Sequence, residues 1–452
     1  MRIVQVVHGF PPESLGGTET YVFQLASALA QRGHEVMVFA RIADPTRTEY
    51  AVDTVARDGF VVTRINNTFR HLDTFAQSYA NAAVAQRFRT FLDVNRPDVV
   101  HFHHLLHLST TCIQEVARRG IPVVMTLHDY WLICQRGRFL KPDLSQCPGQ
   151  TDEGCAHCFA QLLNRKLAPA YQRLKPLFSR QARLKDVLRR FYGRYVAART
   201  PTPEALEQIR QRMAHVREIC QVVTLFLAPS RFLREQFLHF GIPPEKIIFT
   251  ACGLPSLEIK GGDARQKTAP LTFGYIGVVD PVKGVHLLVE AFQPLTGAEL
   301  RIYGGEAGYA PYPDRGRFLA QVRTSPHIHM MGRYDHRELG RILSEVDVVV
   351  VPSIWYENAP LVIREAFLAG KPVVTAAFGG MREWVEDEVN GLLFRQRDVE
   401  DLRQKLARFI ADPALVEKLS SQCPAVKSIE EDAREMEERY RALVRTAACR
   451  RP

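Results

Sequence analysis

Residues 347–374 read DVVVVPSIWYENAPLVIREAFLAGKPVV, and this stretch decides the fold. Its run of valines is typical of a strand that is buried on both faces. A loop follows, and Pro360 suits the first turn of a helix that ends at Gly370, because glycine commonly terminates helices. A second apolar run comes next. A strand, a helix and a strand in this order predict a parallel sheet with helices on its faces.

The same alternation extends outward from this stretch. The predicted strands of the second half are LTFGYIG, LRIYGG, HIHMMG, DVVVVPS and KPVVTA, with helical patterns between them. The first half alternates in the same way around MRIVQVV, EVMVFA, PDVVHFHHL and IPVVMTLHDY. We therefore expect an α/β protein with two doubly wound parallel sheets, whose ligands bind beyond the carboxyl ends of the strands.

The length of 452 residues also favours two domains, since a single core rarely grows past about 250–300 residues. We predict a first domain over 1–225, which includes a cysteine-rich loop at 134–158 and a basic helical insertion at 161–220. The second domain is expected over 226–428. The tail at 429–452 predicts one long charged helix.

Composition and charge restrict the classes of function. The start, MRIVQVVHGF, predicts a first strand and not a signal peptide, and no apolar run approaches the roughly 18 residues of a membrane-spanning helix. We therefore expect a cytoplasmic protein. Lys and Arg number 59 against 49 acidic residues, and this excess favours polyanions, phosphorylated ligands or an anionic membrane surface.

Much of the basic excess lies in one segment. Residues 161–200 contain eleven Lys or Arg and a single acid, Asp186. Over 184–196 apolar and basic residues fall on opposite sides at helical spacing, which predicts a basic amphipathic helix. Two interpretations stay open: the helix binds the anionic inner face of a membrane, or its apolar stripe is buried on the first domain.

Four cysteines follow the spacing C-x12-C-x7-C-x2-C, namely Cys134, Cys147, Cys155 and Cys158. Four thiolates are a common shell for tetrahedral zinc. The loop has little apolar content, so a structural zinc ion would hold it in place. The alternative is four free thiols. A catalytic metal is not expected, because four protein ligands leave no open position.

Several residues of the first half suit ligand binding. Gly16 and Gly17 follow the first strand and precede a helix, whose amino terminus offers N–H groups to an anion, although an ordinary tight turn would look the same. His128 and Asp129 end a strand at the ligand-facing edge, where an imidazole can contact a hydroxyl; a capping Asp beside a buried His is the alternative. His101, His103 and His104 are expected near the cleft floor.

The second half adds charged candidates. Strand LTFGYIG ends at Gly277, and the next loop carries Lys283, which can pair with a diphosphate unless it is an ordinary surface lysine. Glu357 precedes the helix that begins at Pro360, whereas Glu365 lies inside it. The two acids therefore suit two separate contacts better than an acid and its base. Neither G-x-G-x-x-G nor G-x-x-x-x-G-K-[ST] occurs at these turns, which argues against a dinucleotide oxidoreductase and a P-loop NTPase.

Together these pieces resemble the retaining glycosyltransferases of the GT-B fold, specifically glycosyltransferase family 4. The resemblance covers nearly the whole chain and rests on the glycine loop, TLHD, IGVVDPVKG, the glutamate pair, AGKPVV, GGMRE and NGLLF. It implies two Rossmann-like domains that face a cleft. It also implies metal-independent hexosyl transfer from a UDP- or GDP-sugar to a saccharide or lipid-linked acceptor, with retention of configuration, in bacterial cell-surface polysaccharide or glycoconjugate synthesis.

The resemblance also implies residue roles. Glu357 would bind hydroxyls of the donor sugar, Glu365 the ribose, and Lys283 the diphosphate, while His128 would line the donor sugar beside the acceptor. Backbone N–H groups for phosphate or sugar would come from Gly16, Gly17, Gly379 and Gly380, and a further one from Asn358 or Ala359. Gly277 is the remaining donor-binding candidate.

The chain departs from the family pattern at two places. Val278 stands where an arginine is common, and Arg382 is a candidate replacement. Ala359-Pro360 replaces Phe-Gly. Two other functions stay open, a nucleotide-sugar epimerase of the same fold and a non-catalytic polyanion-binding module. Nucleic acid is not expected as a partner, because the basic residues do not alternate with stacking aromatics.

Overall fold

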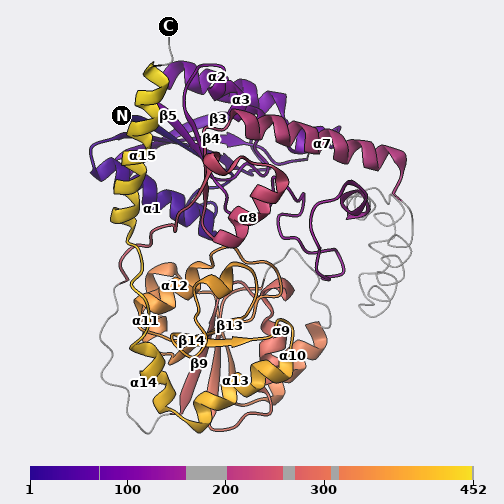
Figure 1. The fold of residues 1–452 in the computed structure, drawn as a ribbon, viewed down its shortest axis with the longest axis vertical. Helices are drawn as coiled ribbons and strands as arrows, with labels where there is room; N and C mark the ends of the chain where they lie inside the picture. Colours follow the sequence, from indigo (N-terminus) through magenta and orange to yellow (C-terminus); the bar gives the residue numbers. More distant parts are fainter. Residues whose placement is uncertain (71, 159–200, 258–269, 307–314, 450–452) are drawn as a thin grey trace.

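The computed structural model describes residues 1–70, 72–158, 201–257, 270–306 and 315–449. The strands in these residues form two sheets, one in each half of the molecule (Figure 1). The basic helix expected at 184–196 lies outside the described residues. Of the insertion expected over 161–220, the last part is described, and it belongs to helix α7 (Pro203–Val222). No helix in the described part of the chain is long and apolar enough to cross a membrane.

The first sheet has the strand order β3-β4-β2-β1-β5-β6-β7-β8. Adjacent strands run parallel except for the antiparallel pair β3 and β4. The strands are β1 (Arg2–Val7), β2 (Glu35–Ile42), β3 (Val52–Arg57), β4 (Phe60–Asn66), β5 (Val99–Phe102), β6 (Val123–Thr126), β7 (Leu225–Ala228) and β8 (Ile247–Phe249).

Both faces of this sheet are covered by helices. Along β1, Val4 and Val6 join one hydrophobic cluster, whereas Ile3 and Val7 join another, as the two-residue period of a strand requires. The first cluster includes side chains of four helices: α2 (Ala82–Asn95), α3 (Thr111–Ala117), α7 and α8 (Arg231–Phe240). The second includes side chains of α1 (Gly17–Gln31) and α15 (Ile429–Cys449).

The first sheet extends beyond the domain boundary expected at residue 225. Leu225 pairs with Val124, and Phe226 pairs with Ile247, so β7 and β8 add a further strand–helix–strand unit to the first sheet. The expected boundary was therefore placed too early. A unit of this kind has the same local pattern in either domain, and only its long-range pairing shows which sheet it joins.

The second sheet is parallel throughout and has the order β11-β10-β9-β12-β13-β14. Its strands are β9 (Leu271–Ile276), β10 (Ala298–Tyr303), β11 (Ile328–Gly332), β12 (Val348–Val351), β13 (Val373–Ala376) and β14 (Gly391–Phe394). Its helices are α9 (Val285–Phe292), α10 (Arg315–Thr324), α11 (Leu339–Ser344), α12 (Leu361–Leu368), α13 (Val399–Ala411) and α14 (Ala414–Ser420).

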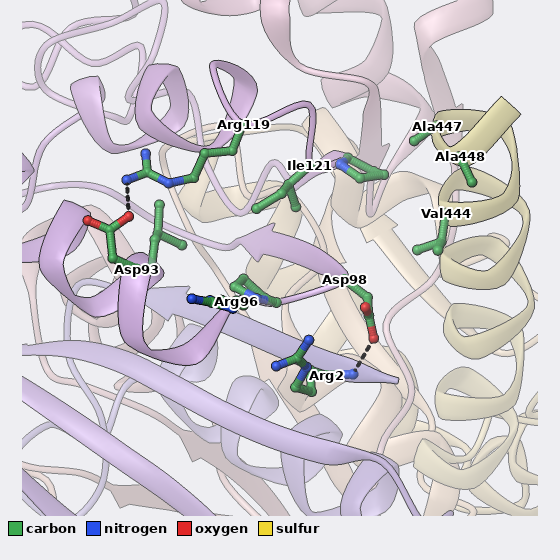
Figure 2. Close-up of a pocket in the computed structure, with 12 residues that line it drawn as sticks. Arg2, Asp93, Arg96, Asp98, Arg119, Ile121, Val444, Ala447 and Ala448 are labelled. Carbon is green, nitrogen blue, oxygen red and sulfur yellow. Dashed lines mark hydrogen bonds and ion pairs between the residues drawn. The ribbon is translucent and has the colours of Figure 1, made fainter. Parts of the chain in front are cut away.

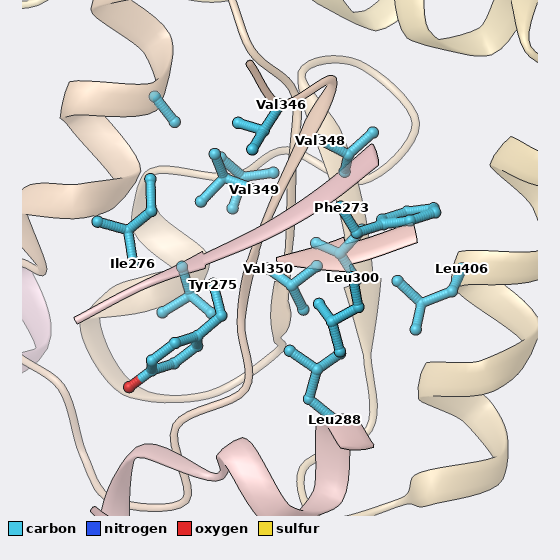
Figure 3. Close-up of a cluster of buried hydrophobic side chains, with 14 of the residues drawn as sticks. Phe273, Tyr275, Ile276, Leu288, Leu300, Val346, Val348, Val349, Val350 and Leu406 are labelled. Carbon is cyan, nitrogen blue, oxygen red and sulfur yellow. The ribbon is translucent and has the colours of Figure 1, made fainter. Parts of the chain in front are cut away.

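The valine run of β12, Val348–Val351, lies at the centre of the second core. Figure 3 shows Val348, Val349 and Val350 among side chains from β9, β10 and neighbouring helices, and all three valines are buried. The expected doubly wound α/β architecture with a long C-terminal helix is confirmed.

The C-terminal helix α15 returns from the second domain and packs against α1 of the first (Figure 1). Tyr21 Oη donates to Asp432 Oδ2 at 2.8 Å, and the N–H of Gly253 donates to the same oxygen at 2.8 Å. Asp432 of α15 thus bonds both α1 and the segment after β8, and these contacts fix the returning helix to the first domain.

Candidate active site

Glu357 is the centre of the candidate site in the second domain. It lies in the loop after β12 and is only 5% exposed. Its Oε1 accepts three hydrogen bonds, from Lys283 Nζ at 2.7 Å, Ser353 Oγ at 2.7 Å and Trp355 Nε1 at 2.8 Å. Lys283 Nζ also lies 5.5 Å from the centre of the Trp355 ring. The two residues expected to contact different parts of a donor thus form an ion pair with each other.

Close backbone contacts shape these loops. Lys283 belongs to η3 (Pro281–Lys283), and Gly284 follows with φ +73°, where an added Cβ would overlap the carbonyl of Pro352. At Gly380, an added Cβ would overlap the carbonyl of Asn358, and the N–H of Gly380 donates to the carbonyl of Glu357 at 2.9 Å. The Gly380 N–H was expected to face a ligand, but in this structure it holds the Glu357 loop.

Asn358 joins the two halves of the site. Its Oδ1 accepts from Ser230 Oγ at 2.7 Å, and its Nδ2 donates to the carbonyls of Leu127 and His128 at 3.1 and 3.2 Å. All three partners belong to the first domain. The side chain next to Glu357 is therefore bonded to the segment that carries His128.

Glu365 lies on α12 and has a partner of its own. His336, in η4 (His336–Glu338), places Nε2 at 3.1 Å from Glu365 Oε1. This hydrogen bond is the main reason why the pKa of His336 is raised. Glu357 and Glu365 share none of these hydrogen-bond partners, which agrees with two separate contacts and not with an acid–base pair.

His128 follows β6, and its imidazole lies near other histidines. Its Nε2 lies 3.2 Å from Nδ1 of His103, and burial lowers the pKa of His128 to about 3. Asp129 accepts from the Trp131 N–H at 2.8 Å and from His104 Nε2 at 3.0 Å. Burial opposes a charge on His104, but Asp129 outweighs burial and raises the pKa of His104. His128 is thus a neutral imidazole beside the hydrogen-bonded pair of His104 and Asp129.

The glycine loop of the first domain also approaches the second domain. Gly16 is the N-cap of α1, and no side chain caps this helix terminus. A Cβ at Gly17 would lie 3.3 Å from Cδ1 of Leu361, at the start of α12. The loop therefore lies beside the helix that carries Glu365, as the expected cleft requires.

Val278 replaces the expected arginine, and two other arginines lie on segments that contact the Glu357 loop. Val278 is 50% exposed, and Gly277 before it uses its N–H to bond the carbonyl of Tyr303 at 2.9 Å. Arg382 is exposed in η5 (Gly379–Glu383). The Arg138 guanidinium lies 5.9 Å from the centre of the Trp355 ring. Sequence reasoning missed Ser353 and Trp355, although both lie within four residues of Glu357. It also missed Arg138, which only the fold brings to the Trp355 ring.

None of the four cysteines forms a disulfide within the described residues. The pKa of Cys158 is raised to about 12, mainly by burial, and the other three thiols contribute in the same direction. Even so, no three His, Cys, Asp or Glu side chains in the described residues are arranged to hold a metal ion. The segment just before the loop is fixed by Arg212, which is buried and donates to the carbonyls of Trp131 and Leu132 at 2.5 and 3.1 Å.

A cavity of about 590 Å³ lies at the opposite edge of the first sheet (Figure 2). It is lined by residues at the starts of β1 and β5, by the turn before β6 and by the end of α15. Arg119 there pairs with Asp93, and Asp98 accepts from the Arg2 N–H at 2.7 Å. None of the predicted site residues lines this cavity.

Comparison with known proteins identifies the family. Residues 15–255 match the model of Glycosyltransferase Family 4, and residues 262–425 match that of Glycosyl transferases group 1. A glycogen synthase of Mycobacterium tuberculosis is 26% identical over 92% of this chain and 88% of its own length. The D-inositol 3-phosphate glycosyltransferase of Mycobacterium bovis is 24% identical over 88% of this chain and 72% of its own.

Solved structures share the fold. Sucrose-phosphate synthase from Thermosynechococcus elongatus has a TM-score of 0.66 and 20% identity, covering 98% of this chain and 99% of its own. Anabaena HepE, solved with UDP and glucose, has a TM-score of 0.63 and 16% identity, covering 97% and 99%. With both domains matched, the chain belongs to Glycosyltransferase Family 4 and is a glycosyltransferase of the GT-B fold.

Proposed function

We propose that this enzyme transfers a sugar from a nucleotide-sugar donor, of the UDP or GDP type, to a saccharide or lipid-linked acceptor with retention of configuration. The observation that carries the proposal is the Asn358 bridge, because it holds the Glu357 loop against the segment of His128. The name of the glycogen synthase relative and the UDP bound to HepE support a nucleotide-sugar donor and a role in polysaccharide or glycoconjugate synthesis.

The geometry suits departure of a nucleoside diphosphate. Lys283 is the cation nearest Glu357, and a bound diphosphate would draw its ammonium away from that carboxylate. Glu357 would then accept hydroxyls of the donor sugar while Ser353 and Trp355 keep its orientation. Glu357 Oε1 also accepts from Ser353 and Trp355, and these bonds hold the carboxylate against its own loop when Lys283 turns to the diphosphate, so Glu357 is a poor general base. That favours a mechanism in which the acceptor attacks the same face of the sugar from which the diphosphate departs. The leaving phosphate then receives the proton of the acceptor hydroxyl.

Incubation with UDP- and GDP-sugars tests the proposal. Release of nucleoside diphosphate that depends on an added saccharide or lipid-linked acceptor supports transfer, and NMR of the product anomer tests retention. Conversion of the donor sugar without an acceptor would indicate the epimerase instead. Binding of polyanions with no turnover would favour the non-catalytic module.

Two further sequence-based hypotheses concern partners. For the cysteine loop we propose a structural zinc that draws the four nearby thiols together, with catalysis independent of metal. Zinc content measured after purification, and again after replacement of Cys155 by Ser, tests it; a metal-free, fully stable protein contradicts it. For residues 161–200 we propose contact with an anionic membrane surface, which flotation with anionic vesicles at low salt tests.

A further inference from the structure

Behind His128, a chain of hydrogen bonds leads through the first domain to the C-terminal helix. His128 Nε2 lies 3.2 Å from His103 Nδ1, and His103 Nε2 lies 2.6 Å from Gln5 Oε1. Gln5 Nε2 then donates to Tyr440 Oη at 3.4 Å. These hydrogen bonds connect the segments that follow β6 and β5 with β1 and α15, and they end on a helix more than three hundred residues from His128 in sequence.

These groups are enclosed and uncharged. Gln5, His103 and Tyr440 are at most 1% exposed. Burial lowers the pKa of His103 well below its usual value, as it does for His128. A neutral imidazole has one N–H and one lone pair, so its hydrogen-bond partners decide which nitrogen carries the proton.

The partners along the chain determine each tautomer in turn. An amide oxygen can only accept, so His103 donates its Nε2–H to Gln5 and keeps a lone pair on Nδ1. His128 must then donate its Nε2–H to that lone pair, which leaves the lone pair of His128 on Nδ1.

Tyr440 holds the amide of Gln5 in this orientation. Its hydroxyl accepts from Gln5 Nε2 and lies 2.6 Å from His101 Nδ1, and it donates to that nitrogen in the tautomer in which His101 Nδ1 carries the lone pair. His101 in turn places Nε2 at 2.7 Å from Thr126 Oγ1. The hydroxyl of Tyr440 therefore bonds both Gln5 and His101. If the Gln5 amide were reversed, the proton of every hydrogen bond in this series would have to move to the opposite partner.

We propose that Gln5, His103 and Tyr440 are positioning residues that fix the tautomer of His128, so that its Nδ1 lone pair accepts a hydrogen bond from a hydroxyl of the donor sugar. The sugar contact rests on the proposed function, whereas the tautomer can be measured without any ligand. The C-terminal helix is in this way part of the active-site support.

Histidine-labelled protein tests the tautomer by ¹⁵N NMR of the ligand-free full chain, with the His128 signal assigned by its loss in His128→Gln. We expect His128 with a proton on Nε2 and none on Nδ1. Tyr440→Phe removes one oxygen and should give a mixture of the two tautomers, and Gln5→Leu should do the same. A proton on Nδ1 in the unsubstituted protein, or an unchanged tautomer in both variants, overturns the proposal.

Tyr21→Phe is the matched control, because it removes a buried hydroxyl that bonds α15 at Asp432 and keeps the ring that packs against His103 and His128. It should leave the His128 tautomer unchanged. In sugar transfer, Tyr440→Phe should lower kcat about tenfold with the donor KM within about twofold, because a misplaced contact acts mainly on turnover. Absence of transfer in a protein that shows the expected tautomer would count against the proposed function and leave the tautomer assignment standing.

Discussion

At the residue scale, Glu357 offers a sharp test of the site. Glu357→Ala removes the acceptor of three donors and leaves Lys283 without its partner, so we expect kcat to fall by roughly 10²–10³. Glu365→Ala should instead raise the donor KM, with kcat within about threefold. Steady-state kinetics distinguishes the two, with the exposed Glu400→Ala as control. Full activity of Glu357→Ala would contradict this division of roles.

His336 carries a prediction about pH. Its hydrogen bond to Glu365 raises its pKa in the folded state, so the protonated imidazole stabilises the fold fully below about pH 6.5, the usual value in an unfolded chain. This contribution is lost as the pH rises through the folded pKa. Because the side chain is 44% exposed, we expect no more than about 0.5 kcal/mol.

Urea unfolding of the unsubstituted protein and of His336→Gln measures this effect. The two should differ at about pH 5.5 and converge at about pH 9. An equal difference at both pH values would show that His336 acts through packing and not through its charge.

At the element scale, the sequence was informative about strands and much less so about loops. Buried parallel strands are continuous apolar runs, so LTFGYIG and DVVVVPS were recognisable without any structure. Polar candidates such as Lys283 and Glu357 could be selected by type and position. Their mutual ion pair and the inward turn of Asn358 could not, because both depend on how separate elements pack.

A prediction about a whole element concerns the loop that carries Glu357. Gly380→Ala would place a methyl group on the Asn358 carbonyl, so the loop must move, and we expect a loss of about 1–3 kcal/mol in stability together with most of the turnover. Gly316→Ala, in α10 with open space around it, is the control and should be neutral or slightly stabilising. Unchanged kinetics in Gly380→Ala would show that the loop tolerates the displacement.

At the scale of the whole molecule, the hydrogen bonds of Asn358 connect the two domains. Asn358→Ala removes bonds to Ser230, Leu127 and His128, so the domains should separate more often, and we expect a larger radius of gyration in X-ray scattering. Asn390→Ala is a matched control, since this buried asparagine bonds only within the second domain. It should reduce stability without opening the molecule.

A double-mutant cycle shows whether the effect passes through the bridge. Ser230 also caps α8, so Ser230→Ala alone mixes two losses, and combination with Asn358→Ala separates them. We expect a coupling of about 1 kcal/mol in unfolding free energy, the usual contribution of one hydrogen bond. Saturating donor should return Asn358→Ala to the compact form, because a ligand held by both domains favours closure. Additive losses, with no compaction by donor, would show that Asn358 stabilises its own loop and not the contact between the domains.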